Sequence, residues 1–131
     1  MNAVLVIKDE TARGEQINTV RLSLVSERLS VKELISRRVQ QEVEQFNLKR
    51  PVCFKALVKP KDAEETTQGF RLAVHHDLDW EIQVETAIEA FKQKCFFIMV
   101  NGKELSDLDD EVVITDTTEI SFIRLMPIVG G

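Results

Sequence analysis

The chain has 131 residues, of which 44% are apolar and 30% are charged, and its formal net charge is −5 at pH 7. This length and composition predict one globular domain that buries a core without disulfides or metal ions. The negative charge argues against nucleic acid as a partner, because proteins that bind nucleic acids present a basic face.

The cysteines and the start of the chain exclude further classes. Cys53 and Cys95 are too few for a disulfide framework or a zinc site, and both lie in apolar runs, so we interpret them as reduced core residues. No run reaches the about 18 apolar residues of a membrane-spanning helix. The first ten residues, MNAVLVIKDE, have no basic segment before their short apolar run, unlike a signal peptide. We therefore expect a cytoplasmic protein with no membrane partner.

A hairpin is predicted at the start of the chain. Residues 3–8 form an apolar, β-branched run that is typical of a strand, and residues 9–16 form a polar turn around Gly14. Residues 17–25 alternate between apolar and polar side chains, as a half-buried strand does. Two neighbouring strands joined by a short loop indicate an antiparallel pair.

An amphipathic helix follows the hairpin. Ser30 and Glu33 have the spacing of a capping box, in which each side chain accepts a hydrogen bond from the other residue's backbone N–H. Behind it, apolar residues at helical spacing continue to Phe46 and predict a helix over residues 31–46. Its single apolar stripe needs one sheet to cover it, so we assign this helix a structural role.

The middle of the chain is less regular. Residues 47–51 break the helical pattern, and residues 52–58 fit either a short strand or a loosely packed segment. Residues 60–69 are polar and predict a loop, after which residues 70–74 are expected to pair as a strand. Trp80, the only tryptophan, is expected to anchor this segment to the core.

His75 and His76 raise the question of a metal site, since Asp77 and Asp79 follow them closely. Adjacent side chains point in different directions, and the chain has no other histidine. We therefore interpret these residues as polar side chains at the protein surface that bind no metal.

The last third of the chain predicts a helix and a second hairpin. Residues 82–93 carry apolar side chains at helical spacing, and residues 95–100 are apolar on both faces, which is typical of a central strand. Asn101 and Gly102 then give the strongest hairpin signal in the sequence, because a type I′ turn requires positive φ at both positions. A short return strand over residues 103–105 fits this turn.

The chain ends in a strand that becomes a tail. Residues 119–125 have the bulky apolar composition of a buried strand, and Pro127 ends sheet pairing because it lacks a backbone donor. Gly130 and Gly131 follow. Two interpretations are open: a frayed terminus, or a slender segment that presents its carboxylate to a partner.

The order of the elements predicts an α+β fold of the β-grasp type. A hairpin, a capped helix, a strand, a tight turn and a terminal strand form a mixed sheet wrapped around one main helix. The first and last strands of this fold pair in parallel at the sheet centre, which suits residues 3–8 and 120–125. We expect a single domain over residues 1–131, with an insertion at 47–94 that carries the second, shorter helix, and a tail at 126–131.

Three segments carry a family resemblance: SVKELI at 30–35, FIMVNG at 97–102 and EISFIRLMPIVGG at 119–131. They resemble the ubiquitin-like proteins and the bacterial sulfur carriers, namely the small subunit of molybdopterin synthase and the thiamine sulfur carrier. The resemblance covers residues 3–46 and 95–131 and is closest to the ubiquitin-like proteins encoded beside activating and conjugating enzymes in bacteria. The insertion at 47–94 and the lack of a glycine at 116–119 depart from the pattern.

The resemblance implies that a partner activating enzyme adenylates the carboxylate of Gly131 with ATP and Mg²⁺. This chain would then be a substrate rather than an enzyme, and it would bind no cofactor itself. Gly130 and Gly131 have no Cβ to collide with a narrow channel. If extended, the tail reaches at most about 20 Å. The tail residues that precede the two glycines are Met126, Pro127, Ile128 and Val129.

Three fates of the terminus remain open. In a modifier, Gly131 passes through a thioester to a lysine on a target protein, with a conjugating enzyme and a deconjugating protease as further partners. In a sulfur carrier, Gly131 becomes a thiocarboxylate. In a non-covalent interaction module, the glycines are incidental. The large insertion favours the modifier, because the sulfur carriers are compact.

The final strand also offers a candidate docking surface. If Phe122 points to the core, Ile123 and Leu125 face outward beside Arg124 and form a recognition patch. The alternative is that the insertion covers this apolar pair.

Overall fold

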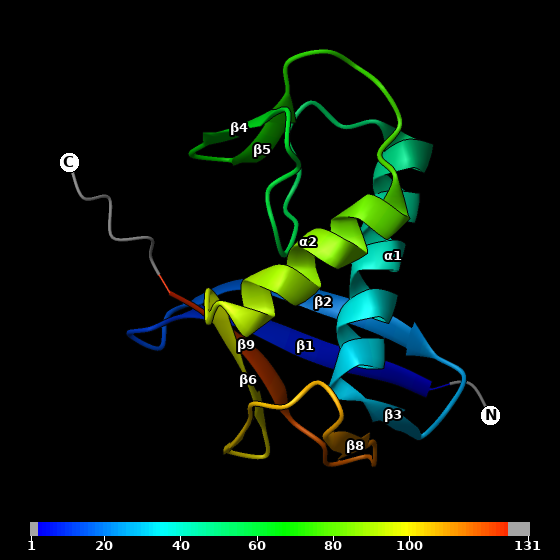
Figure 1. The fold of residues 1–131 in the computed structure, drawn as a ribbon, viewed down its shortest axis with the longest axis vertical. Coiled ribbons are helices and arrows are strands. Elements are labelled where there is room, and N and C mark those ends of the chain that lie inside the picture. The colour runs from blue at the N-terminus through cyan, green and yellow to red at the C-terminus, as the bar shows by residue number, and fades with distance from the viewer. Residues whose placement is uncertain (1–2, 126–131) are drawn as a thin grey trace. The chain divides into compact units, whose positions relative to one another are not determined.

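The computed structural model describes residues 3–125 and has an α+β architecture (Figure 1). The chain divides into two compact units, residues 1–34 with 91–131, and residues 35–90. The boundaries fall within the two helices, α1 (Val31–Lys49) and α2 (Trp80–Lys92). Most of the predicted insertion belongs to the second unit. The organisation as one domain with an insertion stays a prediction.

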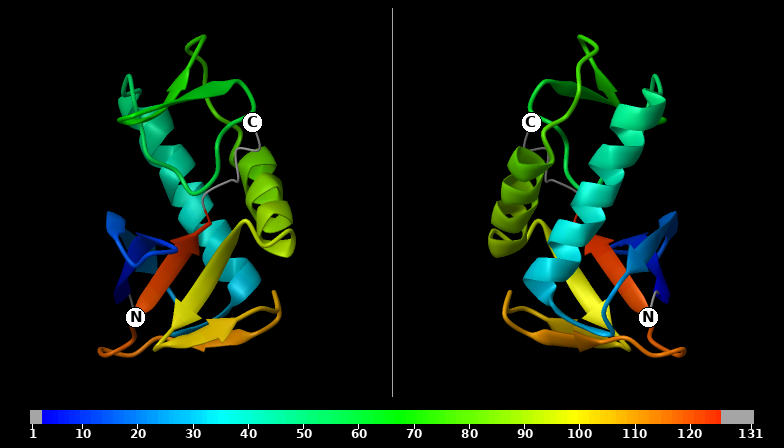
Figure 2. Two further views of the ribbon diagram at one scale, coloured as in Figure 1. Left: turned by 90° about the vertical axis from the view of Figure 1, so that its left-hand side faces the viewer. Right: turned by 90° about the vertical axis from the view of Figure 1, so that its right-hand side faces the viewer.

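A mixed five-stranded sheet forms the first unit. β1 pairs antiparallel with β2 and parallel with β9, and β6 pairs antiparallel with both β9 and β7. Figure 2 shows β9 between β1 and β6. The predicted parallel pairing of the first and last strands is confirmed. In sheet order the strands are β2 (Gln16–Leu24), β1 (Ala3–Thr11), β9 (Ile120–Arg124), β6 (Phe96–Val100) and β7 (Lys103–Leu105).

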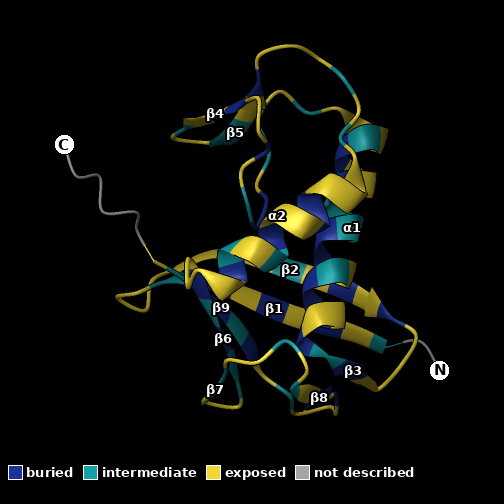
Figure 3. Ribbon diagram, viewed as in Figure 1, coloured by how far each residue is buried: buried dark blue, intermediate teal, exposed yellow. Residues whose placement is uncertain are grey.

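One face of this sheet carries the core of the first unit. Buried and exposed residues alternate along β1, because successive side chains of a strand point to opposite faces (Figure 3). The stacked rings of Phe96 and Phe122 join β6 to β9, with 5.7 Å between their centroids. The buried apolar strand residues on this face are Leu5, Ile7, Leu22, Leu24, Phe96, Ile98, Ile120 and Phe122.

Local sequence signals place the turn and the helix start of this unit. Asn101 and Gly102 have φ values of 50° and 81°, as the predicted type I′ turn requires. The predicted capping box is also present: the Glu33 N–H donates to Ser30 Oγ, and the Ser30 N–H donates to Glu33 Oε1, both at 3.1 Å. A short ribbon of β3 (Arg28–Ser30) and β8 (Glu111–Val113) leads into this helix start.

The second unit has a small apolar core of its own. Phe46 of α1 packs with its ring centroid 4.5 Å from that of Phe54. The hairpin of β4 (Ala63–Thr66) and β5 (Gly69–Leu72) contributes Ala63 and Leu72 to the same cluster. Gly69 is required at this place, because its φ is 121° and a Cβ would lie only 2.4 Å from the carbonyl oxygen of Phe54.

Several predicted boundaries are wrong in the structure. β1 continues through Thr11, although residues 9–16 were expected to form the turn, and α1 ends at Lys49 rather than at residue 46. The polar segment 60–69 contains β4 instead of being all loop. Its strand is held by pairing with β5 and by the side-chain pair of Arg71 and Glu64. Because β4 is mostly polar, its sequence lacks the alternation of apolar and polar residues by which a strand is predicted.

Two residues expected in the core lie at the surface. Trp80 is 40% exposed because it opens α2, where the side chain of the preceding Asp79 accepts the N–H of Glu81 at 2.9 Å. Cys95 is exposed in the link between α2 and β6, and Cys53 is half-buried with its Sγ 3.9 Å from Thr66 Oγ1. The apolar runs next to Trp80 and Cys95 correctly predicted a helix and a strand. They did not predict whether each of these two side chains faces the core or the solvent.

Candidate functional site

The predicted site is the end of the chain that follows β9. β9 has a hydrogen-bonded neighbour on both sides, and beyond it the N–H of Leu125 donates to the carbonyl of Cys95 at 3.2 Å. Pairing on both sides of β9 and this hydrogen bond hold the chain in the sheet as far as Leu125, the last residue that the structure describes. The predicted tail residues lie outside the described part of the chain: Met126, Pro127, Ile128, Val129, Gly130 and Gly131.

The two faces of β9 have different surroundings. Phe122 is completely buried on the core face, so Ile123 and Leu125 belong to the opposite face by the alternation of the strand. Ile123 is half-buried, and Leu125 is 37% exposed. In the sheet register Ile123 lies between Phe97 of β6 and Glu10 of β1.

This opposite face, which we call the outer face, is partly apolar. Val4 is 62% exposed and Val6 is 40% exposed on β1, and Phe97 and Met99 of β6 are half-buried. A hydrogen bond of 2.8 Å from Ser121 Oγ to Glu10 Oε2 crosses the face between β9 and β1. On this face Phe97 and Ile123 lie near the end of β9, next to Leu125, whereas Val4 and Val6 lie beyond its start, because β1 runs parallel to β9 with Ile7 opposite Ile120. The apolar residues at the end of β9 suit a docking surface.

Arg124 lies on the core face with Phe122, and not beside Ile123 and Leu125 as the sequence suggested. Its Nη2 is 3.6 Å from Oδ2 of Asp9, a residue with no exposed surface. The same oxygen accepts a hydrogen bond of 3.3 Å from Asn18 Nδ2. A carboxylate taken out of water needs a cation and hydrogen-bond donors, and this requirement turns Arg124 inward.

Sequence reasoning missed Asp9 because it assigned this residue to a polar turn. A signal was present in the alternation of Leu5, Ile7 and Asp9, which places the carboxylate on the core face once the strand is extended by three residues.

His76 of the second unit joins two loops by its ring. Its Nδ1 is 2.7 Å from the carbonyl oxygen of Asp77, and its Nε2 is 2.5 Å from Oδ2 of Asp62. Both partners are acceptors, so the imidazolium, with an N–H at each nitrogen, satisfies both contacts. Within residues 3–125, no group of three or more histidine, cysteine or acidic side chains is placed to hold a metal ion.

This arrangement predicts a pH-dependent clasp. The Asp77 carbonyl and the Asp62 carboxylate raise the pKa of His76, and the hydrogen bond from His76 lowers the pKa of Asp62. A raised histidine pKa contributes stability that is present below the unfolded value of about 6.5 and is lost as the pH rises through the folded pKa. The lowered pKa of Asp62 adds stability that is lost as the pH falls through its own folded value.

Titration of the His76 ring by NMR is expected to give a midpoint above about 6.5, and Asp62→Asn is expected to lower that midpoint. A midpoint that does not change in the variant would contradict the clasp. His75 is present in the unmodified protein and in the Asp62→Asn variant, so its ring signals serve as the internal reference for the two spectra.

In comparisons with protein-family models, with curated proteins and with solved structures, nothing matches this chain. Neither α1 nor α2, the helices of the described segment, is long and apolar enough to span a membrane.

Proposed function

We propose that this chain is a ubiquitin-like protein modifier with a β-grasp fold, conjugated to target proteins through the carboxylate of Gly131. One observation carries the proposal. β9 lies inside the sheet, parallel to β1, and leads directly into the sequence LMPIVGG. A strand in this place supports a tail that must enter a partner while the body stays outside.

The order of the elements supports the same fold. A hairpin of β1 and β2, a capped helix, β6 with its type I′ turn and a terminal strand follow one another as in the β-grasp. The sheet order β2–β1–β9–β6–β7 places the two parallel strands next to each other away from both edges. The second unit, which contains the β4–β5 hairpin, is the departure from a compact sulfur carrier.

The proposed chemistry belongs to the partner enzymes and consumes ATP. An oxygen of the Gly131 carboxylate attacks the α-phosphorus of ATP and releases pyrophosphate, with Mg²⁺ held by the activating enzyme. An enzyme thiolate then attacks the acyl carbon and releases AMP, forming a thioester. A lysine amine of the target finally displaces the thiol and leaves an amide bond. This chain contributes the carboxylate and the slender tail that positions it.

The outer face is the proposed docking surface for the activating enzyme. Leu125→Asp is expected to raise the KM of activation about tenfold while kcat changes little, because the charge lies at the apolar contact and not at the reacting carboxylate. The matched control is Leu48→Asp, an exposed leucine at 78% in the second unit. Steady-state pyrophosphate release measures both constants. Equal effects of the two variants would contradict docking on the outer face.

Intact mass distinguishes the modifier from the sulfur carrier. The native protein is first weighed to determine whether its mature chain ends at Gly131, as the proposal requires. It is then incubated with ATP, Mg²⁺ and the activating enzyme, with sulfide as the sulfur donor and a lysine-containing protein as the amine acceptor. A reducible adduct with the enzyme, followed by an amide-linked product, supports the modifier. A mass that shows replacement of one carboxylate oxygen by sulfur identifies a sulfur carrier. The P-x-x-G-G ending of this chain is also similar to the ending of the sulfur carriers. If neither product forms, both covalent functions are wrong.

A further inference from the structure

β1 begins before β9 and leaves an open edge inside the sheet. β2 pairs with β1 from Ala3 onward, whereas β9 begins at Ile120, opposite Ile7. Within the described part of the chain, residues 3–6 therefore have no strand beside them on the β9 side. An open edge of this kind is a place where the main chain of another molecule can add a strand.

The main chain of Val4 points to this open edge. The N–H of Leu125 donates to the Cys95 carbonyl on the β6 side, so Phe122, three residues earlier, directs its N–H and C=O to β1. In a parallel pair these groups bond to the residues before and after the opposite residue, which is Asp9. Val4 lies an even number of positions from those residues, so its own N–H and C=O point to the same side.

The open edge is accessible and apolar. Val4 is 62% exposed and Val6 is 40% exposed, and both lie on the outer face. Edge strands are commonly protected by a charged side chain, a proline or a bulge. Residues 3–6, with the sequence AVLV, carry no charge and no proline, and the bulge of β1 lies farther along, at Asp9 and Glu10. The strand thus lacks the features that keep other chains away from an edge.

A hollow of about 750 Å³ lies beside this edge, within the first unit. Residues 3–6 line it together with the turn at residues 114–118. Hydrogen bonds hold this turn: the Thr115 N–H donates to Thr118 Oγ1 at 2.8 Å, and Thr118 Oγ1 donates to the Val113 carbonyl at 3.2 Å. The volume is within the range of ligand sites, and a turn that is already ordered lowers the entropic cost of binding.

The charged side chains that line the hollow are both carboxylates, those of Glu27 and Asp116. Lys8 and Arg21 are the basic residues of β1 and β2, and neither lines the hollow. Arg21 lies opposite Val6 on β2, which is on the other side of β1. Two carboxylates without a basic residue beside them in the lining favour a basic side chain on the occupant.

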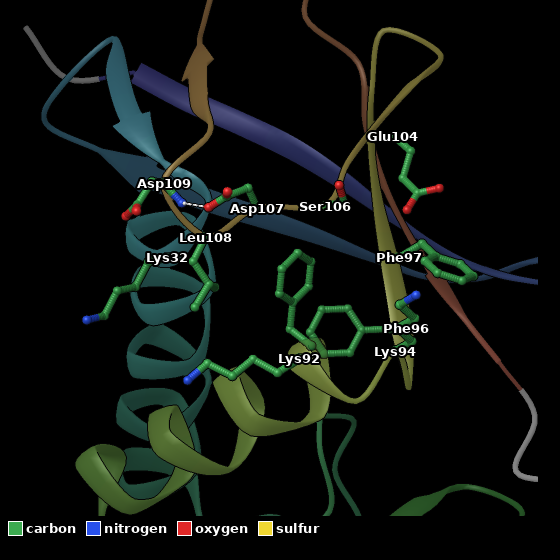
Figure 4. Close-up of a pocket in the computed structure, with 11 residues that line it drawn as sticks. Lys32, Lys92, Lys94, Phe96, Phe97, Glu104, Ser106, Asp107, Leu108 and Asp109 are labelled. Carbon is green, nitrogen blue, oxygen red and sulfur yellow. Dashed lines mark hydrogen bonds between the residues drawn. The ribbon is translucent and has the colours of Figure 1, made fainter.

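The groove beside β6 does not discriminate in this way (Figure 4). Its volume is about 380 Å³, and carboxylates and ammonium groups line it in equal number. These charged residues are Glu104, Asp107, Asp109, Lys32, Lys92 and Lys94. Charge therefore favours neither an acidic nor a basic occupant in that groove.

We propose that the hollow beside β1 binds an extended segment of a partner protein, which adds a short strand to the open edge and carries a basic side chain next to aliphatic ones. The main chain of the segment pairs with Val4. Its aliphatic side chains pack on Val4 and Val6, and its lysine or arginine lies near Glu27 and Asp116.

The chain's own end is a poor occupant of this hollow. β9 runs parallel to β1 and leaves the sheet opposite Thr11, at the other end of β1 from Val4. The strand from Val4 to Thr11 spans about 23 Å. Residues 126–131 reach at most about 20 Å and carry no basic side chain. The binding therefore does not depend on the chemistry of Gly131.

A library of random nonapeptides displayed on phage, selected against the full chain, tests the proposal. We expect enriched sequences with valine, isoleucine or leucine beside lysine or arginine. A synthetic peptide of this kind should slow hydrogen exchange at the Val4 amide and shift the amide signals of Val6 and Thr118. No enrichment over an unrelated protein, or enrichment of acidic peptides, would overturn the proposal.

Two substitutions of Val4 test the pairing of the main chain. Val4→Pro removes the N–H that faces the hollow, and it keeps the pairing with β2, because Ala3 and Leu5 make those bonds. Peptide binding should weaken at least tenfold. Val4→Thr keeps the N–H and the branched shape, so binding should change less than about threefold. The amide signals of β2 show whether each variant is folded.

A scan of N-methylated peptides tests the same pairing without changing the protein. Methylation of the peptide nitrogen that pairs with Val4 should weaken binding at least tenfold, because it removes the donor of the added strand. Binding that survives methylation at every position, or equal binding to folded Val4→Pro and Val4→Thr, would overturn the proposal.

Two charge variants separate the hollow from general electrostatic attraction. The double variant Glu27→Gln, Asp116→Asn should weaken binding at least tenfold. The matched double variant Glu65→Gln, Glu85→Gln neutralises two exposed carboxylates outside the hollow and should leave binding unchanged. Equal effects of the two variants would contradict the proposed site. Competition by a peptide of residues 125–131, or dimerisation of the chain that the basic peptide disrupts, would assign the open edge to this chain itself and overturn the proposal.

Discussion

A chain that lacks Gly130 and Gly131 is expected to lose ATP-dependent activation by at least about 100-fold, because catalysis requires the reacting carboxylate to be placed within a fraction of an ångström. The deletion withdraws the carboxylate by about 7 Å along an extended tail. It also ends the chain on Val129, whose branched Cβ is too wide for a channel shaped around glycine. Exchange of radioactive pyrophosphate into ATP in the presence of the activating enzyme measures this step directly.

Two controls give this experiment its meaning. Gly131→Ala keeps the length of the tail and adds one methyl group, so a loss of activation in this variant isolates the steric requirement. Adding one alanine after Gly131 should block activation until it is removed, because the reacting carboxylate is then no longer on glycine. Unchanged exchange in the truncated chain would refute both covalent functions and leave the non-covalent module.

The parts of the fold that the sequence predicted well are those that depend on neighbouring residues. The turn at Asn101 and Gly102 follows from their tolerance of positive φ, and the helix start follows from the hydrogen bonds between Ser30 and Glu33. The parallel pairing of β1 with β9 involves residues more than a hundred positions apart. It was predicted only because the order of the elements allows few topologies.

The failures have a common physical origin. The β4–β5 ribbon is stabilised by partners that local composition does not reveal, including the pairing of Phe54 with Phe70 through two backbone hydrogen bonds. Asp9 was placed in a turn because a carboxylate on a core face is disfavoured unless distant residues such as Asn18 and Arg124 reach it.

Arg124→Leu is expected to destabilise the first unit by about 2–4 kcal/mol, because it removes a cation from a carboxylate that is fully buried. The lower part of this range is favoured by the 27% exposure of the Arg124 side chain, which lets water replace part of the lost interaction. Native-state hydrogen exchange at the amides of Ile7 and Ile120 measures the change within the sheet. This readout avoids treating a chain of two units as a single cooperative transition.

A second substitution identifies the cause of that loss. If the cost of Arg124→Leu comes from the lost attraction between the guanidinium and the Asp9 carboxylate, then it should fall to about 1 kcal/mol or less when Asp9→Asn is already present, because the amide carries no charge. Arg28→Leu is the matched control, since its partner Glu111 is 57% exposed and a surface pair of this kind contributes at most about 1 kcal/mol. The alternative result is that Arg124→Leu costs the same in the unmodified protein and in the Asp9→Asn variant. That result would mean that packing of the arginine stem, and not its charge, holds this end of β9 against β1.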